Sequence, residues 1–230
     1  MKRKVFGIGS PRTGTTTLGY GLQVLNYKSC LGGSATANLL MPMITTKDYE
    51  NLFKFIDGFE SFDDVPFAHG DVYKILYDQY PEAKFILTER YPQTWYESFK
   101  FQLSLSEEYM EDADNDLTKF IKKNNMVLTP LDKCLNFGWS GLYDHINLTY
   151  GNISFPKSQS HIINVYKQRN QEVKNFFSDK PDRLLVIDIC NGKNEENFKI
   201  LKNFLGIKSK INSFQLMNDN KRNIEIFKNK

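Results

Sequence analysis

The chain has 230 residues, of which 40% are hydrophobic and 14% aromatic, and its formal net charge at pH 7 is +3. This size and composition suit one globular domain with a substantial core, so we expect a single domain over residues 1–230. The charge balance argues against nucleic-acid binding, because the basic run at residues 2–4 is too short to form a basic stripe.

The cysteines and the hydropathy pattern indicate what kind of protein this is and where it is located. Cys30, Cys134 and Cys190 are widely spaced and form no CxxC pair, so the sequence indicates neither a disulfide framework nor a metal site. No apolar run is long enough to span a bilayer, and the first strand begins almost at Met1, which leaves no room for the apolar core of a signal peptide. We therefore expect a cytoplasmic protein without a membrane span, of unspecified oligomeric state.

The first element is an apolar strand over residues 4–8, which runs into a turn with glycines at positions 9 and 14 and then a helix. Gly9 and Gly14 let the backbone bend tightly and approach an anion, and the first N–H groups of the helix point toward it. Four hydroxyls add further donors, those of Thr13, Thr15, Thr16 and Thr17. The nucleotide-kinase pattern has a lysine directly after the second glycine, whereas this chain has Thr15 there and Arg12 as the cation inside the loop.

The following elements alternate between helices and strands. We expect a helix over residues 49–56, a short strand ending in acidic residues within 60–66, and a helix that stops at Pro81. The runs at 84–88 and 184–188 are nearly continuously apolar, which is typical of parallel strands covered on both faces. A last amphipathic helix over 194–205 ends at Gly206. This order predicts an α/β fold with a mostly parallel sheet.

A second candidate phosphate site follows the strand at 84–88. Arg90 ends this strand, Pro92 opens the next helix, and Ser98 lies on that helix. An arginine in this position brings a guanidinium fork to the crevice where open α/β sheets bind ligands. The structural alternative for Arg90 is a surface ion pair with Glu89 or Glu97.

Together these two segments resemble the sulfotransferases that use 3′-phosphoadenosine 5′-phosphosulfate (PAPS). Pro-Arg-Thr-Gly-Thr-Thr at residues 11–16 is similar to their 5′-phosphosulfate loop, and the Arg90 to Ser98 segment is similar to their 3′-phosphate site. The helix at 193–206 also resembles their late helix, whereas the middle of the chain is unmatched. The resemblance implies contacts to PAPS from Pro11, Arg12, Thr13, Gly14, Thr15, Thr16, Thr17, Arg90 and Ser98.

The resemblance also implies an architecture and a reaction. We expect a three-layer P-loop fold, one sulfotransferase-like domain over 1–230, with a mainly helical insertion at about 103–180 on the acceptor side. The reaction would move a sulfonyl group in line from PAPS to a hydroxyl or amine of a small-molecule or glycan acceptor, without a metal. Six aromatic residues of the insertion either line the acceptor pocket or belong to the core: Tyr109, Phe137, Trp139, Tyr143, Tyr150 and Phe155.

Candidate catalytic groups lie in the loop and after the second strand. In the family the loop cation, here Arg12, stabilises charge on the leaving group. Cytosolic members carry a histidine base where this chain has Asp64, and a carboxylate can take a hydroxyl proton from the same place. Asp63 is adjacent and His69 follows closely, so the base stays open among them; Asp64 could equally be a turn residue before Pro66.

Other functions stay open for this sequence, and so does the role of its basic C-terminal residues. The family's late Arg-Lys-Gly segment is missing, and Lys221 and Arg222 are its nearest basic substitute, or part of a solvated tail. A P-loop kinase would share the fold but would need a nucleoside triphosphate with Mg²⁺, and it would lack its usual lysine. A non-catalytic nucleotide-binding module would keep the phosphate contacts without a working base, and an interaction protein would use only the aromatic insertion.

Overall fold

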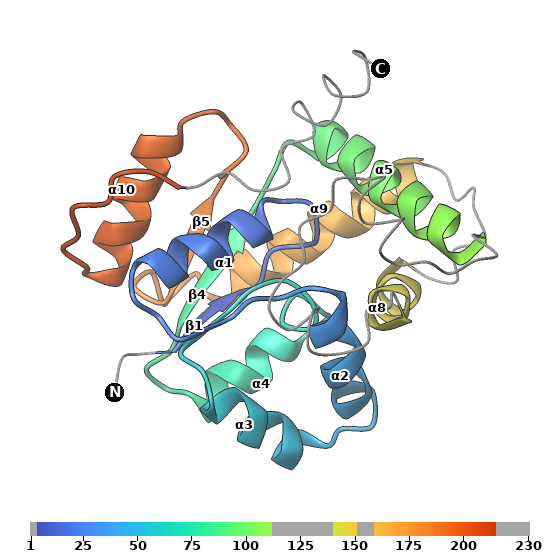
Figure 1. The fold of residues 1–230 in the computed structure, drawn as a ribbon, viewed down its shortest axis with the longest axis horizontal. Helices are drawn as coiled ribbons and strands as arrows, with labels where there is room; N and C mark the ends of the chain where they lie inside the picture. Colours follow the sequence, from blue (N-terminus) through green and yellow to red (C-terminus); the bar gives the residue numbers. More distant parts are fainter. Residues whose placement is uncertain (1–3, 112–139, 151–158, 215–230) are drawn as a thin grey trace.

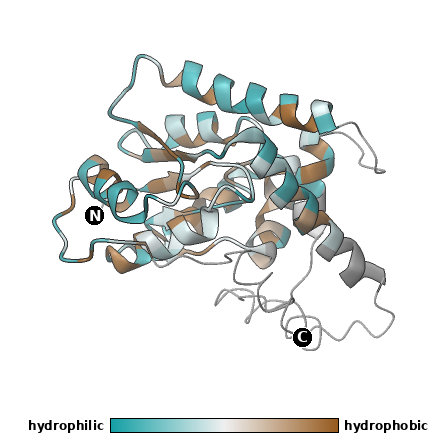
Figure 2. Cartoon of the chain, turned by 90° about the horizontal axis from the view of Figure 1, so that it is seen from above, coloured by the Kyte–Doolittle hydropathy of each residue, from teal (hydrophilic) through white to brown (hydrophobic). Residues whose placement is uncertain are grey.

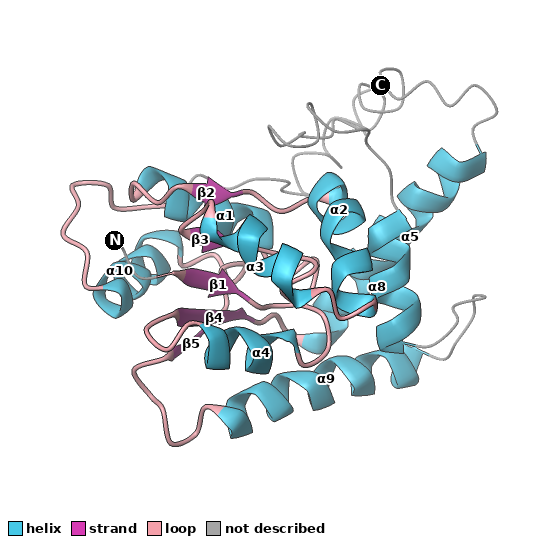
Figure 3. Cartoon of the chain, turned by 90° about the horizontal axis from the view of Figure 1, so that it is seen from below, coloured by secondary structure: helices cyan, strands magenta, loops and turns pink. Residues whose placement is uncertain are grey.

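A computed structural model describes residues 4–111, 140–150 and 159–214. Its centre is a sheet of five parallel strands in the order β2-β3-β1-β4-β5 (Figures 1 and 3). The strands are β1 (Val5–Gly7), β2 (Ser29–Cys30), β3 (Ser61–Phe62), β4 (Lys84–Thr88) and β5 (Leu184–Ile187). The predicted α/β class is therefore confirmed.

Helices connect consecutive strands. They are α1 (Thr15–Val24), α2 (Ser34–Thr45), α3 (Tyr49–Asp57), α4 (Val72–Gln79), α5 (Pro92–Glu111), α8 (Ser140–Tyr150), α9 (Gln159–Phe176) and α10 (Asn194–Leu205). The helices predicted at 49–56 and 194–205 are confirmed almost to the residue, whereas the sequence reading missed α2 and β2. None of the helices in the described ranges is long and apolar enough to cross a membrane.

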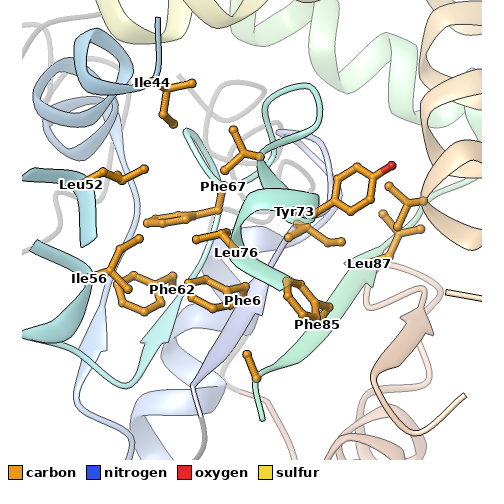
Figure 4. Packing of buried hydrophobic residues seen from close by; sticks show 14 of the residues in the cluster. Phe6, Ile44, Leu52, Ile56, Phe62, Phe67, Tyr73, Leu76, Phe85 and Leu87 are labelled. Carbon is orange, nitrogen blue, oxygen red and sulfur yellow. The ribbon is translucent and has the colours of Figure 1, made fainter. Parts of the chain in front are cut away.

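One face of the sheet is packed with aromatic rings. Phe6 of β1 pairs with Phe62 of β3 and with Phe85 of β4, so three rings project from neighbouring strands to the same side. The Phe6 and Phe62 rings stack with centroids 4.9 Å apart. Helices α2, α3 and α4 and the end of α9 cover these rings (Figure 4). Burial of such large rings contributes much of the stability of a core.

The opposite face carries the alternate strand residues. Val5 and Ile86 pack there against Leu22 of α1 and Phe198 of α10. The strands thus lie between two helical layers (Figure 1). The expectation that the strand at 184–188 is covered on both faces is wrong in part, because β5 is an edge strand and its Val186 is 40% exposed.

A third apolar cluster joins α5, α8 and α9. The Trp95 ring of α5 stacks on Tyr166 of α9, with centroids 4.0 Å apart and planes at 10°. Tyr150 is 2% exposed in this cluster, so this candidate for the acceptor pocket is a core residue. The side chains of Tyr109, Phe137, Trp139, Tyr143 and Phe155 lie outside what the structure describes. Hydrophilic residues dominate the outer surface of α9 (Figure 2).

Candidate active site at the glycine loop

The glycine loop, residues 9–14, connects β1 to α1 and packs directly on the end of β4. A Cβ atom at Gly9 would lie 2.0 Å from Thr88 Oγ1, so only glycine fits there. The backbone is left-handed at Arg12 (φ 72°) and Gly14 (φ 92°). Such a conformation costs a non-glycine residue about 1–2 kcal/mol. The loop is fixed from outside by Trp95, whose Nε1–H donates to the Pro11 carbonyl at 2.9 Å.

Helix α1 begins immediately after the loop and presents its amino end to the same space. The first intrahelical bond runs from Leu18 N–H to the Gly14 carbonyl at 3.0 Å. The N–H groups of a first helical turn have no intrahelical acceptor, and the helix dipole adds partial positive charge at this end. No acidic residue occupies the first turn of α1. The loop and helix start therefore have the geometry of an anion site.

The loop threonines divide between two environments. The Thr13 hydroxyl is fully buried and lies 2.6 Å from both the Ser10 carbonyl oxygen and Thr88 Oγ1, so it holds the loop on β4 rather than facing a ligand. Thr15 donates its hydroxyl to Asp64 Oδ2 at 2.8 Å. The side chain of Thr17 is buried, and that of Thr16 is half-buried.

The Arg12 side chain reaches from the loop to α5. Its Nε donates to Ser98 Oγ at 3.0 Å, and its Nη1 donates to Gln102 Oε1 at 3.1 Å. Burial lowers the pKa of the guanidinium, the Asp64 carboxylate opposes this shift, and the positive charge of Arg90 adds to it. The structure thus brings Arg12, Asp64, Arg90 and Ser98 together. The sequence reading missed Gln102, one helical turn after Ser98 on the same face.

Arg90 follows β4 and is fixed through its backbone by α9. Its N–H donates to the Tyr166 hydroxyl at 2.9 Å, and the same hydroxyl donates to the Arg90 carbonyl at 3.0 Å. Its Nε contacts Thr94 Oγ1 at 3.3 Å. Glu89 pairs with Lys174 at 2.7 Å instead, and within the described ranges Arg90 forms an ion pair with neither Glu89 nor Glu97. The surface ion-pair alternative for Arg90 is thus not what the structure contains.

Asp63 and Asp64 are neighbours with opposite surroundings. Asp63 is 2% exposed, accepts the Gly32 N–H at 2.5 Å, and faces Gly19, where an added Cβ would lie 2.6 Å from its Oδ2. Asp64 adopts a left-handed φ of 61° and turns toward Thr15. Burial raises the pKa of both carboxyls, well above the ordinary value for Asp63, while donation from Thr15 and Val65 N–H lowers that of Asp64. Asp64 is therefore the carboxyl beside the loop.

His69 is held under α8. Its Nδ1 lies 3.2 Å from Nδ1 of His145 and 3.5 Å from Thr149 Oγ1. Burial and the charge of Arg169 lower the pKa of His69, which favours the neutral imidazole. His69 therefore contacts the buried His145 of α8, whereas Asp64 contacts Thr15 at the start of α1. Lys221 and Arg222 lie outside the described residues.

A family profile described as a sulfotransferase domain matches residues 4–222. The chain belongs to the sulfotransferase family. A search of curated proteins gives no match to it. In this sulfotransferase the matched range includes both segments predicted to bind phosphate and also the region between Ser98 and β5, which the sequence motifs alone left unmatched. Within the described ranges no three His, Cys, Asp or Glu side chains gather as metal ligands would.

Proposed function

We propose that this sulfotransferase takes its sulfonyl group from PAPS and transfers it in line to a hydroxyl or amine of a small-molecule or glycan acceptor. One observation carries the proposal: the Arg12 guanidinium lies at the start of α1 together with Ser98, Arg90 and Asp64. The reaction uses this chain's own residues and no metal. A cytoplasmic location belongs to the same proposal, supported by the two cysteines in the described ranges, Cys30 and Cys190, which form no disulfide there.

The donor set fits a ligand that carries anionic groups at two places. Helix N–H groups and Arg12 would hold the 5′-phosphosulfate, and Arg90 with Ser98 would hold the 3′-phosphate, since arginine forks match phosphate oxygens. When bound, PAPS supplies a sulfonyl group on a phosphate leaving group. Gln102 keeps Arg12 aimed across the site, because its amide oxygen accepts from the guanidinium.

Arg12 has the role of stabilising charge on the leaving phosphate. Its side chain is half-buried and anchored by two hydrogen bonds to α5, so little reorganisation is needed when negative charge develops beside it. Arg90 adds positive potential from the adjacent strand end, consistent with its effect on the pKa of Arg12. Removal of Arg12 should therefore lower the rate, and removal of Arg90 the affinity.

Asp64 has the role of general base. It must be ionised to accept the acceptor's proton, and the Thr15 hydroxyl and Arg12 both favour its charged form. Partial burial works in the opposite direction and raises the pKa of Asp64, which makes the carboxylate a stronger base than an exposed aspartate. Asp63 does not compete for this role, because its carboxylate is used by Gly32 inside the fold.

Calorimetric titration tests the proposal. Purified protein is titrated with 3′-phosphoadenosine 5′-phosphate, the product nucleotide of PAPS, and in parallel with ATP plus Mg²⁺. We expect tight binding of the former and a loss of about 10- to 100-fold in Arg90→Ala, the usual value of hydrogen bonds to charged groups. Lys54→Ala is the matched control, because Lys54 pairs with Glu50 on the exposed side of α3. Preference for ATP with Mg²⁺ would instead identify a P-loop kinase.

A further inference from the structure

Arg169 of α9 is a buried cation without a partner. Arg169 is 7% exposed, and its Nε, Nη1 and Nη2 atoms make no hydrogen bond within the described part of the chain. Burial lowers the pKa of this guanidinium, but an arginine stays protonated in proteins. An unpaired charge inside a protein is among the most unfavourable arrangements known, so its presence calls for a counter-ion.

Two further unpartnered polar groups accompany Arg169. The Tyr73 hydroxyl of α4 and Nε2 of His145 on α8 are buried without a hydrogen-bond partner in the described ranges, and each residue is 1% exposed. The Tyr73 ring contacts that of Phe176 of α9, with centroids 5.3 Å apart, and Nδ1 of His145 lies 3.2 Å from Nδ1 of His69. The charge of Arg169 acts on the pKa of Tyr73, His145 and His69, consistent with their being near the guanidinium. Figure 4 shows the Tyr73 hydroxyl at the edge of the apolar cluster. Three helices thus direct unused polar groups to one place.

Nearby carboxylates do not neutralise this place. Asp71 and Glu172 act on Arg169 only through space, since Asp71 pairs with Lys74 at 2.9 Å and Glu172 accepts from Gln168 at 3.0 Å. Burial and Arg169 itself lower the pKa of His145, so the imidazole is neutral and can donate from one nitrogen. The site consists of one uncompensated positive charge with hydroxyl and imidazole groups beside it.

We propose that Arg169, Tyr73 and His145 form a binding site for an oxyanion: a carboxylate, sulfate or phosphate group. The guanidinium offers a planar fork that matches two oxygens of such a group, and the hydroxyl and imidazole can donate to the others. The anion supplies the missing counter-charge. Its source is either an acidic group on the sulfonyl acceptor or a free inorganic anion.

The position of the site favours the acceptor as the source. Tyr150 is hydrogen-bonded to Ser10 of the glycine loop and also experiences the charge of Arg169, so one aromatic side chain links the two sites. His69 hydrogen-bonds His145 and lies shortly after Asp64 in the chain, which connects the oxyanion site to the candidate base. This assignment rests on the proposed function, whereas the oxyanion site itself does not.

The test uses the Arg12→Ala protein, so that the loop contributes less anion binding. It is titrated in a calorimeter with sodium sulfate, with 4-hydroxyphenylacetate, and with the uncharged analogue 4-hydroxyphenylethanol, at constant ionic strength. We expect sulfate or the carboxylate to bind, and the addition of Arg169→Gln to weaken that binding at least about tenfold. Sulfate binding with no preference for the phenol acid identifies a free anion, and preference for the acid over both other probes identifies the acceptor.

Two variants keep the result interpretable. Arg169→Lys retains the charge and loses the fork, so it should bind less tightly than Arg169 and serves if the glutamine variant does not fold. Arg183→Gln is the matched control, because the Arg183 guanidinium is already used by the backbone carbonyls of Ala83 at 2.6 Å and Tyr80 at 3.4 Å. The proposal is wrong if neither anion binds, or if binding is the same with and without Arg169. Titration of the wild type with 3′-phosphoadenosine 5′-phosphate tests the proposed function independently of this site.

Discussion

The glycine loop and the Arg169 cluster each contain an arginine, and the two arginines have opposite surroundings. Arg12 is half-buried and donates to Ser98 and Gln102, whereas Arg169 is deeply buried and its guanidinium has no partner among the described residues. Buried polar groups that are hydrogen-bonded to protein partners carry no desolvation penalty that a ligand must remove. A site with orphaned groups draws its stability from what it binds.

The largest expected effect is on turnover at the loop. Arg12→Ala should lower kcat about 10³-fold, because it removes the cation that stabilises charge on the leaving group. The unfolding free energy should fall by about 1–2 kcal/mol, because the two hydrogen bonds from Arg12 to Ser98 and Gln102 are lost. Transfer of radiolabelled sulfonyl groups from PAPS to any acceptor that the wild type uses gives kcat, and Arg12→Lys is the charge-conserving control. Unchanged turnover in Arg12→Ala would show that Arg12 has no catalytic role.

Asp64→Asn should lower kcat/KM about 10²-fold, the usual contribution of a general base. Because burial raises the pKa of Asp64, the wild-type rate should fall as the pH drops through that raised pKa, since protonation removes the base. The asparagine variant should show no such step. A pH profile of kcat/KM for both proteins checks this, and a step that persists in Asp64→Asn would reassign the base, with His69→Gln the next variant.

Asp63 should instead affect stability. Its pKa is raised in the folded state by burial, so the folded chain holds the proton more tightly than the unfolded chain does. The stabilisation is fully present below the ordinary aspartate pKa and is lost as the pH rises through the raised value. Urea unfolding across this range should therefore show the wild type losing stability relative to Asp63→Asn as the pH increases. Parallel curves for the two proteins would contradict the assignment.

The smallest expected effect concerns Trp95, which connects the glycine loop to the apolar cluster of α5, α8 and α9. Its indole N–H donates to Pro11 of the loop, while its ring packs in the cluster of α5, α8 and α9. Trp95→Phe should cost about 2 kcal/mol of unfolding free energy, because the Pro11 carbonyl loses its donor and the smaller ring leaves space against Tyr166. Circular dichroism during urea unfolding measures it. Tyr166→Phe is the matched comparison, because it removes only the hydroxyl that contacts the Arg90 backbone.

Local patterns explain which parts of the fold could be predicted. The helix at 194–205 has an apolar stripe and ends at Gly206, which takes a left-handed φ of 69°, so its bounds are encoded nearby. Helix α2 lacks such marks and contains Pro42. Its Ala37 and Met41 are buried with Val65, from the loop after β3, so distant packing rather than local preference holds it. Strand β2 has two residues, too few for a periodic pattern.

The sequence by itself determined the α/β class, and it predicted the anion-binding role of the loop around Arg12 and of the segment at Arg90, because each depends on residues close together in the chain. Only the tertiary structure decided that Asp63 faces Gly32 while Asp64 faces Thr15. The two aspartates are adjacent in sequence, and only the backbone conformation sends their side chains in different directions. Only the tertiary structure showed that Arg169, on the same face of α9 as the buried Ile162 and Tyr166, has no hydrogen-bond partner within the described ranges. Charge and solvation depend on what surrounds a side chain, and α4, α8 and α9 meet through contacts between distant segments.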